Sequence, residues 1–562
     1  MTGRIRNVGR MVGIAAIAAS ALLLAACNAI PQSGPVNVGL SDLTKGDQLV
    51  SYSPPGPAKG ASQKDVVIGF VNAASSSQDD YRVAREFLTP EYSSQWDPST
   101  GVFVYEGARP YRSEEDDVAV LSLPGIATVD ERGVLTPSRP GATSDVRFEL
   151  AKVDGQWRIA SAPAGVILDR NVFRTVWAPR DISFLSPDDR LITETRWFLN
   201  GPGMATQVVN ALLGGPSEEL RGAIRTAFPE GTGLVANSVT VLDGTAKIDL
   251  TGQAASADHG ARQLILRQLA ASLQSVQGVN RFDLSINGSL IESSAVGWSD
   301  GGTPTADPRN TLVLSHGTFG SLLAGKVEAL PKLGSRIAEL RPDAVTVAVD
   351  RSSAVVRSGG TLTWTDGAQE IEIPTSGSQP LDPSIDRFGY VWSSAKGVGG
   401  SIIAVKPGED PITLAVPWAA GLRPVGIRIS PDGVRLAMLL ADGDGSTVRV
   451  SGIVRDAHGK PSAITAQGPE QMWATGAPLD LDWSDAQHFA VLTRVGEAGK
   501  VTIGAPRQFS AESGSVAGAT RLSGGGSKAF LRVLNADGRL FAGQGIGWQP
   551  QFEDVQVLAK VG

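Results

Sequence analysis

The first third of the chain passes from helix-like to strand-like spacing of its apolar residues. The segments "KDVVIGFVNAAS" and "DDYRVAREFLTPEYSSQW" have the spacing of amphipathic helices, with Asp79 or Asp80 as the expected N-cap of the second. Further along, "VAVLS", "GIATVD" and "VRFELAKVDGQWRIASAP" alternate apolar and polar residues, and Asp154-Gly155 is typical of a hairpin turn. These patterns predict a small α+β domain over residues 61–180.

Residues 190–300 show the same change of period in a second segment. A helical pattern ends at Gly-Gly-Pro (214–216), which is a common way to stop a helix. A hairpin pattern with Asp-Gly at its turn (243–244) follows, then a long amphipathic helix, then a strand that ends in Asn-Gly (287–288). We therefore predict a second domain, of the α/β class, over residues 190–300.

From residue 308 onward the helical patterns largely disappear and a strand–turn–strand unit recurs. Each unit has a polar turn around an aspartate: Asp350, Asp386, Asp432, Asp485 and Asp537. The steps between these aspartates are 36, 46, 53 and 52 residues, close to the blade length of a β-propeller. Residues 308–562 are therefore predicted to form an all-β propeller of roughly five to seven blades, with a pair of β-sandwiches as the alternative.

The amino-terminal pattern predicts export. Residues 1–26 contain three arginines, no acidic residue and one apolar run of small side chains. The run, about 14–16 residues long, is too short for a membrane-spanning helix and matches a secretory signal peptide. Leu24, Ala25 and Ala26 precede Cys27 in the pattern that a lipoprotein signal peptidase recognises. We predict cleavage before Cys27, which would carry the lipid (S-diacylglycerol and N-acyl chains); the alternative is a buried cysteine behind an uncleaved anchor.

Composition narrows the classes of function. Cys27 is the only cysteine, so the exported chain would have no disulfide to stabilise it. Residues 27–60 are rich in Pro, Gly and Ser and would tether the body to the lipid. Loss of the signal peptide takes the formal net charge from −7 to −10, with 47 basic and 57 acidic residues remaining. This acidic balance argues against nucleic acid and against broad electrostatic binding to anionic lipid.

Several of these segments resemble known domains. Two helices followed by a curled antiparallel sheet, over residues 61–180, resemble the NTF2-like domains. The strings "ALLGGP", "FPEGTGL", "VLDGTAKIDL", "RQLILRQLAASL" and "VNRFDLSINGS" resemble the GerMN domain of sporulation and germination proteins, and "SPDGVRLAMLL" resembles the repeat of TolB-type propellers. The order of lipobox, tether, NTF2-like domain, GerMN domain and propeller, with "VVIGFVNAASSSQDDYRVAREFLTP" near its start, resembles the LpqB lipoproteins of actinobacteria.

That resemblance implies a function which the residues alone do not give. Proteins of the LpqB family are surface lipoproteins on the outer face of the cytoplasmic membrane. They associate with the extracytoplasmic domain of the sensor histidine kinase MtrB and modulate the MtrA–MtrB two-component system in cell-wall homeostasis and division. The alternative hypothesis is a scaffold lipoprotein that binds cell-wall glycan, through the propeller face or the NTF2-like cone, without contacting a kinase.

The chain contains few patterns that carry chemistry. It has no nucleophile elbow, no phosphate-binding loop and no His-Glu-x-x-His, and its four histidines are widely separated in sequence. Ser393 and Lys396 match Ser-x-x-Lys, but the match lies in a strand-rich segment and is interpreted as chance. Asp442–Ser446 has calcium-like oxygen spacing without the required twelfth-position glutamate, and is interpreted as a blade turn. We therefore expect no enzyme, no catalytic residue, no metal and no cofactor, and an unrecognised hydrolase is the weakest alternative.

The tryptophans offer a way to separate the two leading hypotheses. Six of the eleven lie in the propeller segment: Trp364, Trp392, Trp418, Trp473, Trp483 and Trp548. Glycan binding predicts exposed Trp or Tyr beside carboxylates on one propeller face, and Trp418 is the best candidate for such a rim position. Kinase binding instead predicts an apolar patch rimmed by polar residues on the GerMN or NTF2-like surface.

Overall fold

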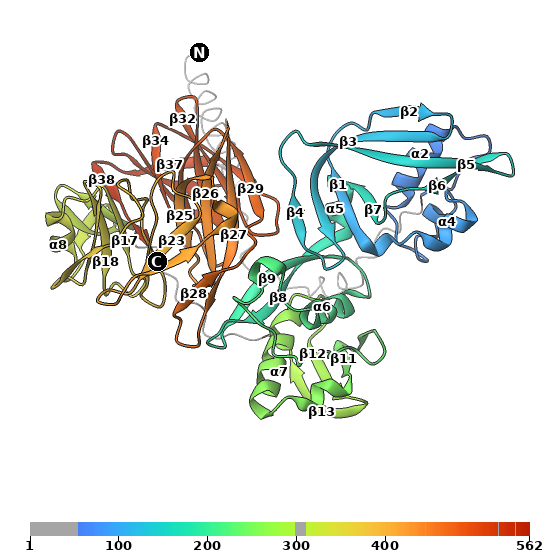
Figure 1. Cartoon of the computed structure of the whole chain (residues 1–562), viewed down its shortest axis with the longest axis horizontal. Helices are drawn as coiled ribbons and strands as arrows, with labels where there is room; N and C mark the ends of the chain where they lie inside the picture. Colours follow the sequence, from blue (N-terminus) through green and yellow to red (C-terminus); the bar gives the residue numbers. More distant parts are fainter. Residues whose placement is uncertain (1–53, 298–310, 444, 526–527, 546) are drawn as a thin grey trace, which may run out of the picture. The chain divides into compact units, whose positions relative to one another are not determined.

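The computed structural model of the chain describes residues 54–562, apart from 298–310, 444, 526–527 and 546 (Figure 1). Residues Pro54–Gly562 form one compact unit. The predicted signal peptide, Cys27 and all of the tether before residue 54 lie outside the described residues. Within the described part of the chain, no helix combines the length and the apolar character needed to cross a bilayer.

The first domain packs helices against a curved sheet. Its helices are α2 (Gln63–Ala73), α3 (Arg82–Arg85), α4 (Pro90–Gln95) and α5 (Arg170–Val176), with the 3-10 turn η2 (Pro98–Thr100). Its strands are β1 (Gly101–Tyr105), β2 (Tyr111–Glu115), β3 (Val118–Asp130), β4 (Leu135–Pro137), β5 (Thr143–Val153), β6 (Gln156–Ser161) and β7 (Val166–Asp169), in the order β6-β5-β3-β1-β7. The long strand β3 also pairs with β2 and with β4. The predicted α+β class of this domain is thus seen directly.

The second predicted helix of this domain is broken into α3 and α4. Asp79, Asp80 and Tyr81 all have positive φ (49°, 55° and 56°), so the chain turns sharply before α3. Tyr81 is the N-cap of α3 and its side chain accepts no capping hydrogen bond, so the prediction that Asp79 or Asp80 caps this helix is wrong. Thr89 begins α4 by accepting a hydrogen bond from the Tyr92 amide, with a proline at the first helical position.

The second domain places two helices on one face of a four-stranded sheet. Its elements are β8 (Trp177–Leu185), β9 (Leu191–Leu199), α6 (Met204–Leu213), η3 (Glu218–Leu220), β10 (Thr240–Leu242), β11 (Thr245–Leu250), η4 (Gly252–Ser256), α7 (His259–Leu273), β12 (Arg281–Ile286) and β13 (Ser289–Ala295). The sheet order is β10-β11-β12-β13, and β11 runs parallel to β12. The β8–β9 hairpin buries Ile182 and Phe184 in the same core as α6 and α7, so this domain includes a hairpin that begins before residue 190.

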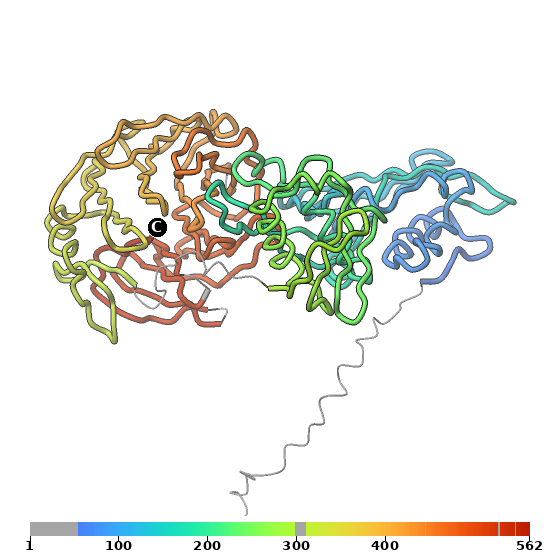
Figure 2. The backbone as a smooth tube through the Cα atoms, turned by 90° about the horizontal axis from the view of Figure 1, so that it is seen from below, coloured from blue at the N-terminus to red at the C-terminus, as the bar shows by residue number. Residues whose placement is uncertain are grey.

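The carboxy-terminal part is a β-propeller of six sheets in the described residues, arranged as a ring (Figure 2). Its elements are β14 (Thr311–Ser315), β15 (Thr318–Leu323), β16 (Lys326–Ala329), α8 (Gly334–Glu339), β17 (Ala344–Val347), β18 (Ala354–Ser358), β19 (Thr361–Thr365), β20 (Glu370–Ile373), β21 (Ser384–Ile385), β22 (Val391–Ser393), β23 (Ser401–Val405), β24 (Ile412–Ala415), η5 (Pro417–Ala419), β25 (Arg423–Ile429), β26 (Arg435–Asp442), β27 (Gly445–Arg455), β28 (Pro461–Ile464), β29 (Glu470–Thr475), β30 (Ala477–Trp483), β31 (Phe489–Val495), β32 (Ala498–Gly504), β33 (Ala511–Ala517), β34 (Ala519–Ser523), η6 (Lys528–Phe530), β35 (Arg532–Asn535), β36 (Leu540–Gln544), β37 (Gly547–Phe552), β38 (Val555–Leu558) and β39 (Lys560–Val561).

The two ends of the propeller segment close the ring. Strand β38, from the end of the chain, pairs with β14 and completes the sheet that β14, β15 and β16 begin. The chain then continues into β39, which pairs with β17 of the next sheet. Figure 2 shows the carboxy terminus inside the ring, where the Gly562 carbonyl accepts a hydrogen bond from Arg428 (3.1 Å). The end of the chain therefore contributes both to closing the ring and to filling its centre.

One propeller loop connects all three domains. The loop between β32 and β33 carries Arg507, whose guanidinium donates to the Glu219 carboxylate (2.7 Å) of the second domain. The same side chain reaches the Leu135 carbonyl of the first domain (3.3 Å), and its own carbonyl accepts from the Trp197 indole (2.9 Å). Both Arg507 and Glu219 are buried. This loop therefore fixes the propeller to the other two domains.

Candidate functional site

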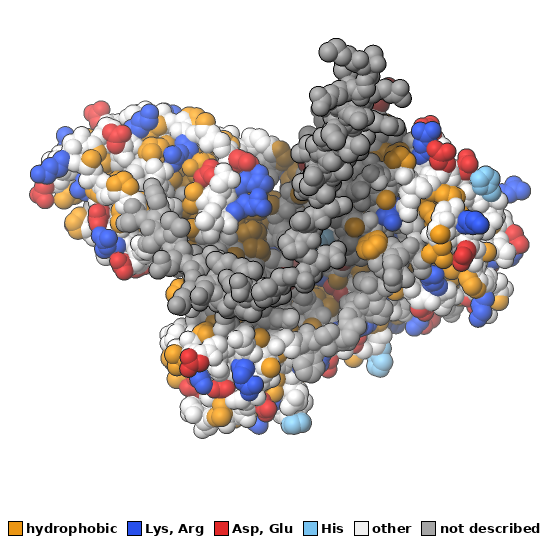
Figure 3. Space-filling view, turned by 180° about the vertical axis from the view of Figure 1, so that it is seen from behind, with side chains coloured by type: hydrophobic (Ala, Val, Ile, Leu, Met, Phe, Trp, Pro, Cys, Tyr) orange, Lys and Arg blue, Asp and Glu red, His pale blue; other side chains and the backbone are white. Residues whose placement is uncertain are grey.

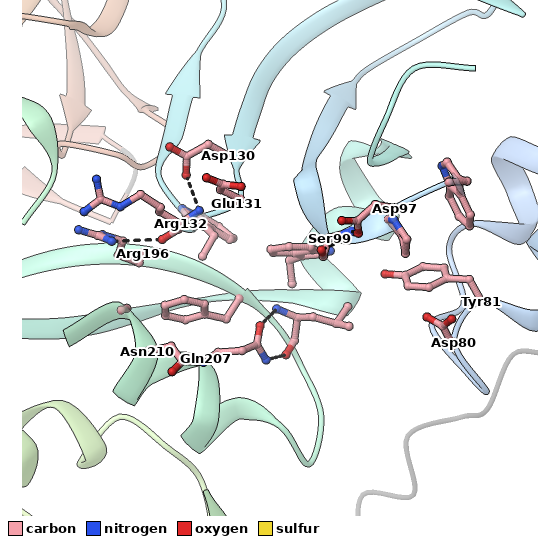
Figure 4. Close-up of a pocket in the computed structure, with 18 of the residues that line it drawn as sticks. Asp80, Tyr81, Asp97, Ser99, Asp130, Glu131, Arg132, Arg196, Gln207 and Asn210 are labelled. Atoms are coloured by element: carbon pink, nitrogen blue, oxygen red, sulfur yellow. Dashed lines mark hydrogen bonds between the residues drawn. The ribbon is translucent and has the colours of Figure 1, made fainter. Parts of the chain in front are cut away.

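A pocket of about 810 Å³ opens where the first domain meets the β8–β9 hairpin and α6 (Figure 4). Its volume lies within the range of small-molecule sites, roughly 300–1,000 Å³. Three segments of the first domain line it: the turn before α3, the end of α4 with η2, and the β3–β4 turn. The second domain supplies the ends of β8 and β9 and one face of α6.

A glycine brings the β3–β4 turn close to β9. Gly133 has φ 78°, and a Cβ at this position would lie 2.5 Å from the Trp197 carbonyl oxygen. The Gly133 carbonyl in turn accepts a hydrogen bond from the Trp197 amide (2.8 Å). A larger residue would push the turn away from the strand, so Gly133 sets the width of the pocket at this end.

Aromatic rings form much of the wall. Trp96 packs edge-on against Tyr81, with ring centroids 5.7 Å apart. Trp177, Trp197 and Phe198 follow on the β8–β9 hairpin. Trp96 and Trp197 are almost wholly buried, which makes this wall part of the core as well as part of the pocket.

Three arginines line the pocket, and each is already hydrogen-bonded to the protein. Arg85 donates to the Asp80 carboxylate (2.9 Å), to the Ser93 carbonyl within α4 and to the Trp96 carbonyl directly after α4. Arg132 donates to three successive carbonyls at the end of α6, at 2.9–3.1 Å. Arg196, 1% exposed, pairs with Glu194 (2.7 Å) and donates to the carbonyl of Arg132 (3.2 Å).

Three of the carboxylates at the pocket make no salt bridge within the described residues: Asp97, Asp130 and Glu131. Asp97 accepts from the hydroxyl (2.6 Å) and amide (2.8 Å) of Ser99, and these bonds hold its pKa below the usual value. Asp130 uses one oxygen to accept two backbone amides of its own turn. The pocket lining thus holds four carboxylates (Asp80, Asp97, Asp130 and Glu131) and three guanidinium groups, and its formal charge is negative by one.

A second candidate site is the open face of the β10–β13 sheet. Ile248 and Leu284 point into the helix-covered core, so their neighbours along β11 and β12 face outward. At the centre of the outer face, Lys247 pairs with Asp283. Large hydrophobic side chains are exposed around this domain: Val235 (50%), Leu242 (58%), Leu290 (63%) and Ile291 (39%). Val495 is the fifth such side chain among the described residues, and it lies in the propeller.

The structure does not describe the residues that the sequence predicted as the lipidation site. Cys27, Leu24, Ala25 and Ala26 lie outside the described residues, so the lipidation site stays a prediction. No group of three or more potential metal ligands occurs among the described residues. Figure 3 shows histidine side chains at separate places on one face of the molecule rather than gathered in one. The sequence predicted an apolar patch on the GerMN or NTF2-like surface without naming its residues, and it did not predict the pocket, because each is assembled from segments far apart in the chain.

The two accidental motifs occupy ordinary structural positions. Ser393 ends strand β22 and its hydroxyl donates to the Pro374 carbonyl (2.7 Å), so Ser-x-x-Lys does not open a helix here. Asp442 ends β26 and Gly445 begins β27, as expected for a turn within a blade. The Asp442 carboxylate lies 3.4 Å from the Arg139 guanidinium, which is a domain contact.

The propeller tryptophans are not exposed. Trp392 and Trp483 are buried, and the other four are half-buried. The prediction that Trp418 is a rim residue is wrong, because its ring packs over Gly468 and against the apolar core between two blades. Trp473 is covered by the Arg139 guanidinium, 4.1 Å from its ring centroid. Tyr390, the one tyrosine of this segment, is also buried.

The fold and the two sites define a class: a multidomain protein with an α+β domain, an α/β domain and an all-β propeller. Three family models match in this order, namely the LpqB lipoprotein N-terminal domain (residues 56–174), a sporulation and spore germination domain (residues 181–292) and the LpqB lipoprotein β-propeller (residues 317–557). The chain belongs to the LpqB family of lipoproteins. The predicted family, GerMN domain and propeller are thereby confirmed, while the NTF2-like character of the first domain stays a prediction.

Similar proteins match along most of their length. The LpqB lipoprotein of Thermobifida fusca is 27% identical over 560 residues, covering 87% of this chain and 88% of that protein. The LpqB lipoprotein of Cutibacterium acnes is 25% identical, with 87% of each chain covered. That of Bifidobacterium longum is 28% identical, with 80% of each covered. The resemblance therefore extends over all three domains.

Proposed function

We propose that this protein is a lipid-anchored lipoprotein on the outer face of the cytoplasmic membrane that regulates a sensor histidine kinase of the MtrB type. In this role it binds the extracytoplasmic domain of the kinase and adjusts two-component signalling in envelope homeostasis and division. The observation that carries the proposal is the exposed apolar surface of the GerMN domain, in a chain of the LpqB family.

The predicted lipid anchor supports such a role. Acyl chains on Cys27 would hold the body against the bilayer that contains the kinase, and confinement to one membrane raises the effective concentration of each partner for the other. Modest intrinsic affinity is then sufficient. Binding alters signalling only if the lipoprotein contacts one conformational state of the kinase better than another.

The GerMN sheet face is the proposed docking surface. Four of the five large hydrophobic side chains that are exposed among the described residues belong to this one domain. Leu242 and Leu290 are the most exposed, on the outer edge strands β10 and β13, and they flank the Lys247–Asp283 pair. The arrangement differs from the expected patch, since the charged pair lies in the centre and the apolar groups lie at the margins. Burial of the two leucines would supply the affinity, and the charged pair would supply specificity.

In the described part of the propeller, the exposed aromatic surface that the glycan hypothesis needs is not present. Among the described propeller residues, no tryptophan or tyrosine is exposed on any blade. Stacking on sugar rings requires an accessible aromatic face. We therefore prefer the kinase partner, and we assign no catalytic residue to the chain.

The test is binding of the body, residues 28–562, to the purified extracytoplasmic domain of the kinase, with cell-wall sacculi as a parallel bait. We expect saturable binding to the kinase domain. The double variant Leu242→Glu/Leu290→Glu should weaken this binding at least tenfold, because both leucines would have to bury a charge. Isothermal titration calorimetry measures both affinities.

Val495→Glu is the matched control, since Val495 is 47% exposed but lies in the propeller. It should leave kinase binding unchanged. Equal loss in the control and in the double variant would contradict the GerMN surface. Retention on sacculi without binding to the kinase domain would favour the glycan scaffold and refute direct contact with the kinase.

A further inference from the structure

The pocket between the first domain and the β8–β9 hairpin has an unbalanced set of charges. Its three arginines are directed at carbonyl oxygens or at carboxylates of the protein, as described above, and offer a ligand little. Asp97, Asp130 and Glu131 make no salt bridge within the described residues, and the lining as a whole carries one more carboxylate than guanidinium. Figure 4 shows Asp130 and Glu131 on one side of the pocket and Asp97 on the other. A ligand with a positive charge is therefore favoured over a neutral or an anionic one.

Tyr81 gives an independent indication that the pocket takes a ligand. Its side chain is nine-tenths buried, at 9% exposure, yet its hydroxyl has no hydrogen-bond partner among the described residues. In Figure 4 this hydroxyl is directed into the pocket, toward Ser99 and Asp97. The hydroxyl itself is accessible from the pocket, and no described residue of the protein binds it, so it is free to bind a ligand there.

The hydroxyl has the protonation state needed to bind. Burial, and secondarily the charge of Asp80, raises the pKa of Tyr81 to about 12. At neutral pH the group is therefore a neutral phenol, which accepts a hydrogen bond through its oxygen and donates one to a carboxylate. An N–H donor on a ligand suits that oxygen.

The other residues that line the pocket favour an organic cation over a metal ion. No group of three or more His, Cys, Asp or Glu that would hold a metal occurs in the described parts of the chain, which argues against a bare metal ion. Trp177, Trp197 and Phe198 also line the pocket and contribute aromatic surface to it. Ammonium groups are attracted both to carboxylates and to the faces of aromatic rings.

We propose that this pocket binds an organic ligand that carries a primary ammonium group on an aromatic or aliphatic body. The ammonium group lies at Tyr81 and Asp97, on one side of the pocket, and the body lies against the aromatic residues of the lining. This ligand site goes beyond the proposed regulation of a kinase and does not depend on it, because it uses none of the residues of the GerMN sheet face.

The test compares a matched pair of probes on the body, residues 54–562, which forms one compact unit. 2-Phenylethylamine is cationic at pH 7, and 2-phenylethanol is its neutral analogue of similar shape. We expect the amine to bind at least tenfold more tightly than the alcohol, and its affinity to fall as salt is raised from 50 to 500 mM. N-Acetylglucosamine serves as the sugar probe and should not bind measurably.

Two substitutions locate the binding. Tyr81→Phe should weaken amine binding about tenfold while leaving the melting temperature unchanged, because the lost hydroxyl has no partner in the protein. Glu131→Gln should weaken binding about threefold and reduce its salt dependence. Glu149→Gln removes the same charge from an exposed position on β5 of the same domain, away from the pocket, and should have no effect.

Three results would overturn the proposal. Equal affinity for the amine and the alcohol would show that charge does not select the ligand. Tighter binding of N-acetylglucosamine than of the amine would reassign the pocket to a sugar. Amine binding that Tyr81→Phe and Glu131→Gln leave intact would place the cation elsewhere on the protein.

Discussion

At the scale of single residues, aspartate side chains set the turns of the propeller. Asp386 accepts hydrogen bonds from the amides of Phe388 and Tyr390, and Asp485 does the same for Gln487 and His488. Because an aspartate that bonds to amides two to four residues ahead is a common local device, these turns were predictable from sequence alone.

A pH-dependent contribution follows from one of these turns. The Nδ1 of His488 lies 2.9 Å from the Asp485 carboxylate, and this hydrogen bond raises the pKa of His488. A group whose pKa is raised by folding contributes its full stabilisation below its unfolded pKa, and loses it as the pH rises through the folded pKa. His488→Asn should therefore lower the free energy of unfolding at pH 5.5 and have almost no effect at pH 9.

The size of this effect is small because 41% of the His488 side chain is exposed. We expect a loss of less than about 1 kcal/mol at pH 5.5, measured by urea denaturation at both pH values. A loss of equal size at pH 5.5 and pH 9 would mean that packing, rather than the ion pair, accounts for the effect.

At the scale of elements, the sequence predicted strands and turns well and their assignment to blades less well. Asp350, Asp386, Asp432 and Asp485 each lie between the first and second strands of a sheet, but Asp537 lies between the second and third. In the sheet β34-β35-β36-β37 the recurring aspartate turn therefore falls one strand later than in the other sheets. Strand β38 was not predictable as the strand that closes the ring, because its partner β14 lies at the other end of the segment.

The closing strand provides a direct test of the propeller. Val557 is buried (6%) on β38, whereas its neighbour Gln556 faces solvent. Val557→Asp should lower the free energy of unfolding by about 3 kcal/mol or more, because it places a charge in the core between two blades. Gln556→Asp, one residue earlier on the same strand, should change it by less than about 0.5 kcal/mol. Similar thermal melts for the two variants would contradict the observed closure.

At the scale of the whole molecule, the order of domains was predictable and their junctions were not. Local strings such as "VLDGTAKIDL" identify a domain without any tertiary information. The ligand pocket draws Tyr81, Asp97, Glu131 and Trp197 from four separate segments, and no local pattern marks them as neighbours. Trp418 was predicted at a rim because the residues that cover it, around Gly468, lie about fifty positions later in the sequence.

The contact of Arg507 with Glu219 tests how firmly the domains are joined. Arg507→Ala would leave the Glu219 carboxylate buried (4% exposed) without its partner. Removal of one member of a buried ion pair costs about 3–5 kcal/mol, so we expect a clear loss of stability in thermal melts. Arg494→Ala, at an exposed position on β31, is the control. Equal melting temperatures for the two variants would show that the junction contributes little.

The proposed contact joins the GerMN sheet face to the extracytoplasmic domain of the sensor kinase. The most direct measurement places a photo-crosslinking amino acid at position 290, 242 or 495 of the full-length protein in living cells. We predict a crosslinked adduct with the extracytoplasmic domain of the kinase from positions 290 and 242, and none from position 495. Adducts with the kinase from position 495 alone, or with cell-wall glycan in place of the kinase, would contradict the account.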